Sequence, residues 1–381
     1  MKILFLNYEY PPLGGGAANA NHYIFQEFSK IPDLEVELVT SSIDKNYIEE
    51  RVGKNIIIHR LPIGKNPKNL HYQSIKELLV YSWKAYQFSV QLTRDKKFDL
   101  VHAFFTLPGG LIAYLIKRKF NLPYIVSLRG SDVPGYSERF SFIYKIFTPL
   151  FTFIWKKSSA TVANSQGLKE LALLSNPKQE ISVIYNGIDI NRFQPNEEDK
   201  PKNEFIIMPG ASRITQRKGL KYLIQAFQKV ASRHPRLRLE IMGEGDEKNN
   251  LEKQVKEANL SDKISFLGRI PQEKVAKYYQ RASLFVLPSL NEGMSNAMLE
   301  ALASGLPLIA TDTGGSKELI TEKENGFIVK MKSAEDIAAK IELLFNDPEL
   351  RKKMAENSRQ KALKMSWQKV AESYYNLYKT L

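Results

Sequence analysis

The chain has 381 residues, of which 43% are apolar, 25% charged and 11% aromatic, which excludes a small single module and a disordered or fibrous protein. It contains no cysteine, which excludes disulfides, thiolate nucleophiles and Cys-bound metal clusters and is compatible with a reducing cytosol. The net charge of +14 favours anionic partners, but charge alone does not choose among nucleotide phosphates, acidic lipids and nucleic acid.

Short apolar runs alternate with longer segments of helical periodicity, the pattern of parallel sheets covered by helices on both faces. In the first part of the chain the expected strands are residues 2–7, 35–40, 56–60, 99–102, 124–128, 160–163 and 181–184. In the second part they are residues 204–209, 237–242, 264–267, 284–287, 306–310 and 327–329. The sequence therefore predicts two doubly wound α/β domains.

Turn-forming and charged residues separate these two parts. Asn186 to Asp189 and the polar run 196–203 suit a linker, so we expect a boundary near residue 198, between domains of residues 1–198 and 199–365. The last segment, 366–381, has the spacing of an amphipathic helix, and the pattern leaves open which domain it completes. We expect neither a signal peptide nor a transmembrane helix, because the apolar runs are too short.

Ligands of open parallel sheets bind beyond the carboxyl ends of the strands, so the loops after strands are the places to search. The first such loop contains Gly14, Gly15 and Gly16 ahead of a helix, where backbone amides can approach a phosphate closely. Two prolines, and Asn19 in place of a third glycine, break the dinucleotide-binding pattern. Contact with a ligand is the favoured interpretation and a flexible turn is the alternative.

A second loop follows the expected strand at 204–209. It contains Gly210, Arg213 and Lys218 ahead of the next helix. Two cations five residues apart in such a loop can hold a diphosphate from two sides and offset the charge of a departing nucleotide. A solvated basic turn is the alternative.

The third loop, residues 288–296, is the most informative. Ser295 is placed to cap the helix that follows, so nearby amides point at any anion in front of it. These amides belong to Gly293, Met294, Ser295 and Asn296. Glu292 precedes the helix and Glu300 follows eight residues later, and such carboxylates can accept hydrogen bonds from sugar or ribose hydroxyls. A surface position for Glu300 is the alternative.

Two residues of the first part also lie at the expected ligand edge. His102 ends one strand, and Arg129 follows the next strand at the start of the run Arg129 to Asp132. A lone histidine is more often structural than catalytic, but both residues are candidates for a catalytic role because of where their strands end.

In their order and spacing, these motifs resemble the group 1 retaining glycosyltransferases of GT-B architecture. The resemblance covers nearly the whole chain. It rests on the glycine loop, on Asn186 to Asp189 with Phe193 and Pro195, on Arg213 with Lys218-Gly219, on Gly243 to Gly245, Gly268 and Pro288-Ser289, and on Glu292 and Glu300 as the family's Glu-x7-Glu. It implies two Rossmann-like domains that face a cleft, the first presenting the acceptor and the second binding a nucleotide-sugar donor.

The resemblance also assigns roles in the second domain. Arg213 and Lys218 would bind the donor diphosphate, and Glu300 would bind the ribose. Glu292, with the amides of residues 293–296, would bind the donor sugar and phosphate. Because the cations and the helix N-terminus stabilise the leaving diphosphate, neither a metal nor a cofactor is expected.

Further contacts to the donor are implied on both domains. Residues Gly14 to Gly16 would close over it from the first domain, and the backbone around Arg269 and Ile270 would meet the base. The nucleotide-sugar is a substrate, with a UDP-sugar as the first expectation and a GDP-sugar as the second. The family often has a histidine where this chain has Arg129, so that histidine's roles do not transfer, and an anionic acceptor is one explanation.

The implied activity is retaining transfer of a hexosyl or N-acetylhexosaminyl group to a glycan or lipid-linked acceptor in cell-envelope polysaccharide or glycolipid assembly, in the cytoplasm. One alternative is a nucleotide-sugar epimerase of the same architecture, which would need Glu9 and Asp132 as acids. Another is a nucleotide-sugar-binding protein without catalysis. A nucleic-acid partner is not expected, because no basic-aromatic module appears.

A membrane surface is a further candidate partner. Residues 140–157 interleave aromatic side chains with Lys145, Lys156 and Lys157, and Arg139 precedes them. This mixture suits an interfacial helix pair on the anionic inner face of the cell membrane. Packing of the same aromatic residues onto the first domain's sheet is an equally good interpretation.

Overall fold

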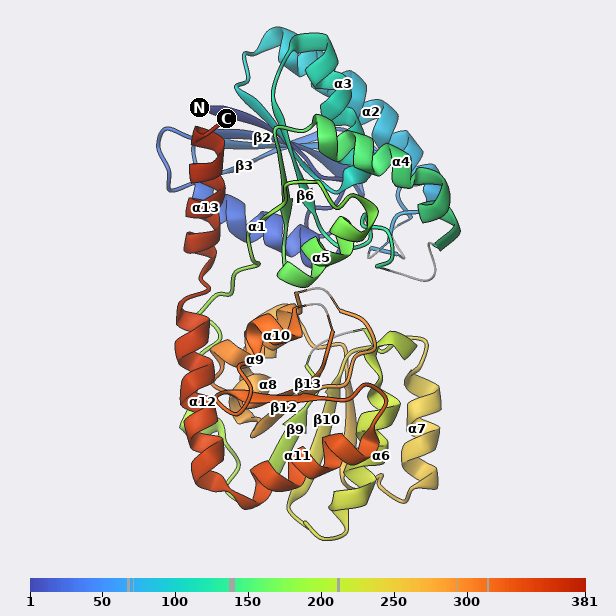
Figure 1. The fold of residues 1–381 in the computed structure, drawn as a ribbon, viewed down its shortest axis with the longest axis vertical. Coiled ribbons are helices and arrows are strands. Elements are labelled where there is room, and N and C mark those ends of the chain that lie inside the picture. The colour runs from blue at the N-terminus through green and yellow to red at the C-terminus, as the bar shows by residue number, and fades with distance from the viewer. Residues whose placement is uncertain (67–68, 71, 137–140, 211–212, 293, 314) are drawn as a thin grey trace. The chain divides into compact units, whose positions relative to one another are not determined.

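The structure is a computed structural model that describes every residue except 67, 68, 71, 137–140, 211, 212, 293 and 314. The chain divides into two units, one of Met1–Asn186 together with Trp367–Leu381 and the other of Gly187–Ser366. Each unit has a sheet covered by helices on both faces (Figure 1). The expectation of two doubly wound α/β domains is confirmed.

The sheet of the first unit has eight strands within the described residues, in the order β3-β4-β2-β1-β5-β6-β7-β8. The strands are β1 (Lys2–Leu6), β2 (Glu35–Ser42), β3 (Ile48–Val52), β4 (Ile56–Pro62), β5 (Leu100–Phe104), β6 (Tyr124–Leu128), β7 (Ala160–Ala163) and β8 (Ser182–Val183). Neighbouring strands are parallel except β3 and β4. The apolar runs of β1, β2, β4, β5, β6 and β7 are buried on both sides, as parallel sheets require.

Helices of the first unit cover its sheet in two groups. On one face lie α2 (Ile75–Asp95), α3 (Leu111–Phe120), α4 (Ser141–Lys157) and α5 (Gln166–Ser175), and on the other lie α1 (Gly16–Phe28) and α13 (Trp367–Lys379). The aromatic face of α13 is buried, and Trp367 stacks on Tyr23 of α1 at 5.3 Å between ring centroids. The C-terminal helix is therefore part of the first unit.

The second unit repeats this plan with six strands in the order β11-β10-β9-β12-β13-β14 within the described residues. Its strands are β9 (Phe205–Met208), β10 (Leu237–Met242), β11 (Ile264–Gly268), β12 (Leu284–Leu287), β13 (Leu308–Thr311) and β14 (Gly326–Val329). One face packs against α6 (Leu220–Ala231), α7 (Lys248–Glu257) and α11 (Ala334–Asn346). The other packs against α8 (Val275–Arg281), α9 (Asn296–Ala303) and α10 (Ser316–Leu319), and α12 (Pro348–Leu363) contributes to both cores.

The first unit ends at Asn186, which is earlier than the boundary expected near residue 198. Residues 187–198 belong to the second unit because two of their apolar side chains are buried there. Ile188 pairs with Ser366, and Phe193 packs edge-on against Tyr279 of α8. The polar run that suggested a linker follows these buried residues, so it marks a surface segment of the second unit.

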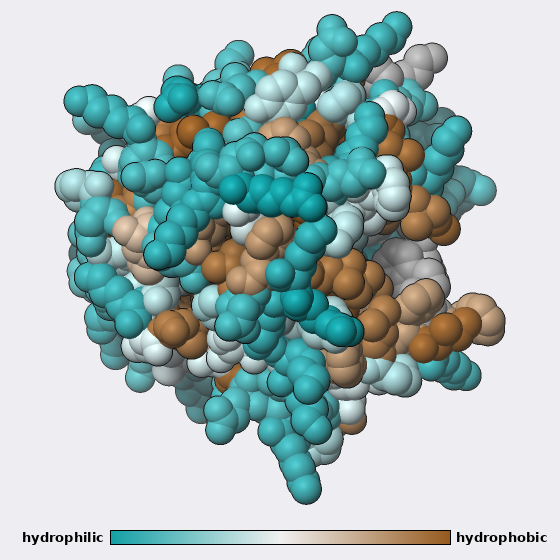
Figure 2. Space-filling view, turned by 90° about the horizontal axis from the view of Figure 1, so that it is seen from above, coloured by the Kyte–Doolittle hydropathy of each residue, from teal (hydrophilic) through white to brown (hydrophobic). Residues whose placement is uncertain are grey.

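The face drawn in Figure 2 is mostly polar, with apolar groups exposed between polar ones. Within the described part of the chain, none of the helices is long and apolar enough to cross a bilayer.

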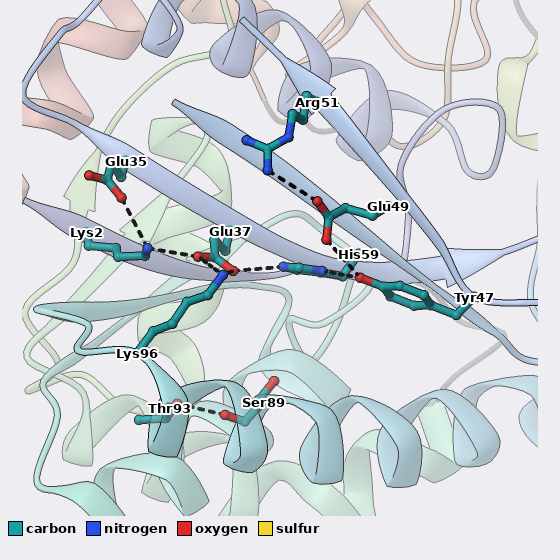
Figure 3. Close-up of polar contacts among 10 residues, drawn as sticks. All are labelled: Lys2, Glu35, Glu37, Tyr47, Glu49, Arg51, His59, Ser89, Thr93 and Lys96. Atoms are coloured by element: carbon teal, nitrogen blue, oxygen red, sulfur yellow. Dashed lines mark hydrogen bonds and ion pairs between the residues drawn. The ribbon is translucent and has the colours of Figure 1, made fainter. Parts of the chain in front are cut away.

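A buried ion cluster neutralises a carboxylate near the amino ends of the first unit's strands (Figure 3). Glu37 of β2 accepts hydrogen bonds from Lys2 at 2.9 Å, Lys96 at 2.8 Å and His59 at 2.9 Å. Burial alone would raise the pKa of Glu37, but the hydrogen bonds from His59, Lys96 and Lys2 outweigh it and lower the pKa to about 2. The cluster lies away from the carboxyl ends of the strands, so we assign it a structural role.

Candidate active site

The strand order of each sheet places two important loops side by side. In the first unit, β1 and β5 are neighbours whose following helices, α1 and α3, lie on opposite faces. In the second unit the same is true of β9 and β12, which lead to α6 and α9. Neighbouring strands that send their chains to opposite faces open a crevice at their carboxyl ends, where ligands of such sheets bind.

At the crevice of the second unit, Lys218 and Glu292 form an ion pair. Lys218 lies in the short 3₁₀ helix Gln216–Lys218, and its Nζ donates a hydrogen bond to Oε1 of Glu292 at 2.5 Å. Ser289 Oγ donates to the same oxygen at 3.1 Å. Both charged side chains are largely buried. The two predicted ligand contacts are thus partners of each other in this structure.

Glu292 is held in its charged form. Burial raises the pKa of Glu292, but the charges of Lys218 and Arg217 and the hydrogen bonds from Lys218 and Ser289 outweigh burial, so the net shift is downward. Lys218 is therefore already paired with an anion. A diphosphate that binds here must share this ammonium with Glu292 or displace the carboxylate.

The backbone joins the two loops that carry this pair. Leu290 N–H donates to the carbonyl oxygen of Arg217 at 2.8 Å. Gly219 has a φ of +64°, and a Cβ atom there would lie 2.1 Å from the carbonyl oxygen of Pro288. Only glycine fits this position, so the Lys218-Gly219 sequence is required by close packing of the loops as well as by charge.

The N-terminus of α9 lies in the same loop region. Ser295 Oγ accepts a hydrogen bond from Met298 N–H at 3.4 Å, so Ser295 caps the helix as expected. Met294 is buried in the core and Asn296 begins the helix. Gly210 packs against α9, because a Cβ there would lie 2.8 Å from Cβ of Ala297. Gly293, the remaining predicted contact of this loop, lies outside the described residues.

The other predicted donor contacts have separate surroundings. Tyr279 forms a side-chain hydrogen bond with Glu300 on α9. Burial raises the pKa of Glu300 to about 7, although Tyr279 and the charge of Arg192 act in the opposite direction. Arg213 is exposed in the loop after β9, and desolvation together with repulsion from Arg217 lowers its pKa.

The predicted contacts to the base follow β11, which is the edge strand of the second sheet. Arg269 is exposed, and Ile270 is half-buried against the core next to α8 and α9. These two residues follow a strand that lies two positions from β9 in the sheet, and they leave the sheet at the same carboxyl end as the loop of Lys218.

In the first unit, the glycine loop wraps around Glu9. Gly14 has a φ of +96°, and a Cβ atom there would lie 2.6 Å from Oε2 of Glu9. The same oxygen accepts a long hydrogen bond from Gly15 N–H at 3.4 Å. Gly15 is the N-cap of α1, which begins at Gly16 and has no capping side chain at that position. The carboxylate of Glu9 therefore accepts the hydrogen bond from the Gly15 amide, which was expected to bind an anion of the ligand.

Arg129 extends from the loop after β6. Its Nη2 donates to Oδ1 of Asn186 at 2.8 Å, and its guanidinium lies over the ring of Phe104 at 4.5 Å. Burial lowers the pKa of Arg129, whereas Tyr374, Asp132 and Glu9 act in the opposite direction. Arg129 is thus the cation of a mostly buried polar cluster that includes Glu9.

His102 is a core residue, which corrects its assignment as a catalytic candidate. It has no exposed surface, and its ring nitrogens lie 2.6 Å from Oη of Tyr378 and 2.7 Å from Oγ of Ser127. Burial and the charge of Arg129 lower the pKa of His102 well below its ordinary value. A neutral imidazole enclosed by β6 and α13 cannot touch a substrate in this arrangement.

Two residues have larger roles here than their sequence signals suggest. Asp132 accepts hydrogen bonds from three backbone amides and shapes the Arg129 loop, and Glu9 lies against the glycine loop. An aspartate three residues after the start of a post-strand loop is the usual signal for such local hydrogen bonding. Glu9 takes one partner, Gly15, from its own loop, whereas the charge of Arg129 acts on it from the loop after β6.

Glu9 makes stability depend on pH. Burial raises the pKa of Glu9 to about 7, despite the opposing effects of Gly15, Arg129 and Tyr8. A raised carboxyl pKa means that the folded state binds the extra proton, so stability falls as pH rises from about 4.5 to about 7. We expect Glu9→Gln to gain about 1 to 2 kcal/mol relative to the native chain between pH 5 and pH 8.

Denaturant unfolding at both pH values measures this gain, and Glu170→Gln on an exposed position of α5 is the control. An identical pH dependence for the native chain and Glu9→Gln would show that Glu9 titrates normally.

Comparisons with known proteins find family profiles and relatives that match this chain. The family profile described as glycosyl transferases group 1 matches residues 189–361, and that of glycosyltransferase family 4 matches residues 14–192. An uncharacterised glycosyltransferase of Methanocaldococcus jannaschii is 28% identical over 381 residues, covering 100% of this chain and 99% of the relative. The capsular polysaccharide biosynthesis glycosyltransferase CapM of Staphylococcus aureus is 28% identical over 294 residues, covering 72% of this chain and 74% of the relative.

Solved structures share the fold over the whole chain. Sucrose-phosphate synthase of Thermosynechococcus elongatus superimposes with a TM-score of 0.84 and 21% identity, covering 100% of this chain and 98% of its own. Anabaena HepE in complex with UDP superimposes with a TM-score of 0.78 and 19% identity, covering 100% of both chains. The two parallel-sheet units are therefore those of the GT-B fold. The chain belongs to the group 1 glycosyltransferases, enzymes that transfer sugars from nucleotide-sugar donors.

Proposed function

We propose that this glycosyltransferase moves a hexosyl or N-acetylhexosaminyl group, with retention and without a metal ion, from a nucleotide-sugar to a glycan or lipid-linked acceptor of the cell envelope, in the cytoplasm. The observation that carries the proposal is the buried Lys218–Glu292 pair beside the capped N-terminus of α9. An ammonium, a helix N-terminus and a carboxylate together match a diphosphate joined to a hydroxyl-rich sugar.

The negative charge of the donor diphosphate supports the assignment of Arg213 and Lys218 as the cations that bind it. Arg213 and Lys218 lie in the loop after β9, at the crevice of the second sheet. In the proposed reaction the acceptor hydroxyl attacks on the face from which the diphosphate leaves, and the leaving diphosphate takes up the hydroxyl proton. The new glycosidic bond forms as the bond to the diphosphate breaks. Cations at that position stabilise the charge that develops on the leaving group.

Names of relatives support the substrate classes. HepE was solved with UDP, so a UDP-sugar is the first donor to test and a GDP-sugar the second. CapM is named for capsular polysaccharide biosynthesis, which supports an envelope glycan as acceptor. Arg129, a cation at the ligand edge of the first unit, supports an acceptor that carries negative charge.

A donor panel tests the proposed function. The purified chain is incubated with UDP-, GDP- and ADP-sugars, and donor hydrolysis and thermal stabilisation are measured with and without a chelator. Proton NMR of the product with a matching acceptor reports the anomeric configuration. Stabilisation by one nucleotide class, activity in chelator and a retained anomer are expected. Activity lost in chelator and restored by a divalent cation, or an inverted anomer, would contradict the proposal.

The two carboxylates are expected to act on different parts of the donor. Glu300→Gln should weaken the binding of free nucleotide about tenfold, because a charge-assisted hydrogen bond to the ribose is lost. Glu292→Gln should leave nucleotide affinity unchanged or tighter, since Lys218 is released, while turnover falls about 100-fold. Calorimetric titration with free nucleotide and an assay with the whole donor separate the two effects.

Glu349→Gln, at an exposed position of α12, is the control for both variants. Equal losses of free-nucleotide affinity in the Glu292 and Glu300 variants would contradict the division of roles.

A further inference from the structure

The second unit contains a cavity of about 1070 Å³ at the end of its sheet opposite to the Lys218–Glu292 pair. Phe205 begins β9, Ser283 precedes β12 and Pro307 precedes β13, and all three residues line the cavity. These strands are parallel, so the cavity lies at their amino ends. Pockets for small molecules span about 300 to 1000 Å³, so the volume suits such a ligand. Binding of the donor does not account for this cavity.

Three arginines, Arg236, Arg351 and Arg359, line the cavity. Among the residues that the structure describes, no carboxylate forms an ion pair with any of them. Their guanidinium groups donate to backbone carbonyl oxygens instead, at 2.8 Å from Arg236, 2.5 Å from Arg351 and 2.7 Å from Arg359. A carbonyl oxygen carries no net charge, so these bonds leave the positive charges without a counter-ion.

The acidic residues of the cavity wall offset little of this charge. Glu197 is paired with Lys200 at 2.7 Å, and Glu204 is paired with Arg238 at 3.3 Å. The remaining acidic residue of the wall, Glu356, is exposed on α12. The wall therefore presents an excess of positive charge, which favours an anionic ligand.

Two of the arginines repel each other. Burial lowers the pKa of Arg351, the charge of Asp347 acts in the opposite direction, and the charge of Arg236 lowers the pKa further. An anion held by both guanidinium groups would relieve this repulsion. Phosphate suits the position, because its oxygens can accept two parallel hydrogen bonds from one guanidinium.

Part of the cavity wall is aromatic and apolar. The rings of Phe205 and Phe345 lie 5.1 Å apart, and the guanidinium of Arg351 lies 5.1 Å from the centre of the Phe205 ring. Four prolines also line the cavity: Pro195, Pro201, Pro307 and Pro348. A planar ring packs well on such a surface, whereas sugar hydroxyls would lose hydrogen bonds to water there.

We propose that this cavity binds a phosphate monoester of a planar aromatic group, with the phosphate at Arg236 and Arg351 and the ring on the surface of Phe205 and Phe345. This goes beyond the proposed function, because the ligand is neither the donor nor the acceptor. Cations alone would take any small anion, and an aromatic surface alone would take a neutral ring. Both in one cavity select a ligand that has both parts.

The probe is 1-naphthyl phosphate, which has the ring and the phosphate but lacks the ribose and diphosphate of a nucleotide. Calorimetric titration of the full chain at low salt should show one site per chain. The probe should bind at least about tenfold more tightly than inorganic phosphate or 1-naphthol, because each of these keeps only one of the two contacts. Inorganic phosphate or 1-naphthol binding as tightly as the probe would overturn the proposal.

Variants test whether the probe occupies the cavity. Arg236→Gln with Arg351→Gln should weaken its binding about 10- to 100-fold. Ala355→Phe, on the part of α12 that lines the cavity, fills space without changing charge and should weaken binding about tenfold. Arg94→Gln with Arg118→Gln, at exposed positions of α2 and α3, removes the same charge from the first unit and should bind as the native chain does.

The absence of probe binding, or equal binding by all these variants, would overturn the proposal. So would weakening by the arginine substitutions but not by Ala355→Phe, since the phosphate would then bind outside the cavity. Because Ala355→Phe keeps both arginines, it tests the cavity even where their loss prevents folding, which circular dichroism reports.

Lys218→Met should bind the probe as the native chain does, and loss of binding in this variant would show that the probe occupies the donor site. Sugar transfer by the cavity variants should match that of the native chain. The titrations contain neither donor nor acceptor, so a failed transfer assay leaves their result unaffected.

Discussion

Lys218→Met should lower turnover by about 100- to 1000-fold, the cost of losing a cation aimed at charge that grows in the transition state. It should also destabilise the second unit by about 2 to 4 kcal/mol, because the carboxylate of Glu292 stays largely buried without its counter-charge. Methionine keeps the apolar stem of the side chain, so both losses report on the ammonium. Steady-state kinetics and denaturant unfolding measure them.

The double variant Lys218→Met with Glu292→Gln separates catalysis from folding. Removing both charges should restore most of the stability while turnover stays low, since only the burial of a lone charge is relieved. Lys221→Met, at an exposed position of α6 close by, is the matched control. Unchanged turnover in Lys218→Met would remove this lysine from the donor site, and unchanged stability would show that the pair contributes nothing to folding.

Most of the strands could be predicted because they are buried on both faces and form uninterrupted apolar runs. The exception is β3, whose residues Ile48–Val52 include Glu49, Glu50 and Arg51 at an exposed sheet edge. Only its antiparallel pairing with β4 makes this segment a strand, and pairing leaves no trace in local composition. The boundary between the units was misplaced for a related reason, since Ile188 and Phe193 are isolated buried residues among turn formers and form no apolar run.

The sequence named individual candidate residues for the site but not the contacts between them. Lys218 and Glu292 are 74 residues apart, and only the adjacency of β9 and β12 brings them together. His102 looked like a candidate because it ends a strand. Its partner Tyr378 lies 276 residues further along the chain, in a helix whose attachment to the first unit the sequence did not reveal. The residue types in each loop could be recognised from the sequence, because they are local. Which side chains contact each other depends on the order of the strands in the sheet, which local sequence does not show.

Asp132→Ala should destabilise the first unit by roughly 3 to 5 kcal/mol, because backbone donors lose their acceptor and each buried unpaired donor costs about 1 to 3 kcal/mol. Asp132 Oδ1 accepts from the amides of Arg129 at 2.8 Å and Gly130 at 3.0 Å, and Oδ2 accepts from Thr106 N–H at 2.8 Å. Asp132→Asn keeps one acceptor oxygen and should lose about half as much stability.

Hydrogen exchange shows where Asp132→Ala loosens the structure. The amides of Thr106, Arg129 and Gly130 should exchange about 100-fold faster in this variant than in the native chain. A uniform increase in exchange across the first unit would indicate global unfolding instead. Nucleotide affinity should stay unchanged, because Arg213, Lys218 and Glu300, the residues proposed to bind the nucleotide, lie in the second unit. Transfer should nevertheless fall, since Arg129 depends on this loop for its position at the ligand edge. If transfer survived the loss of loop protection, Arg129 would have no part in the reaction.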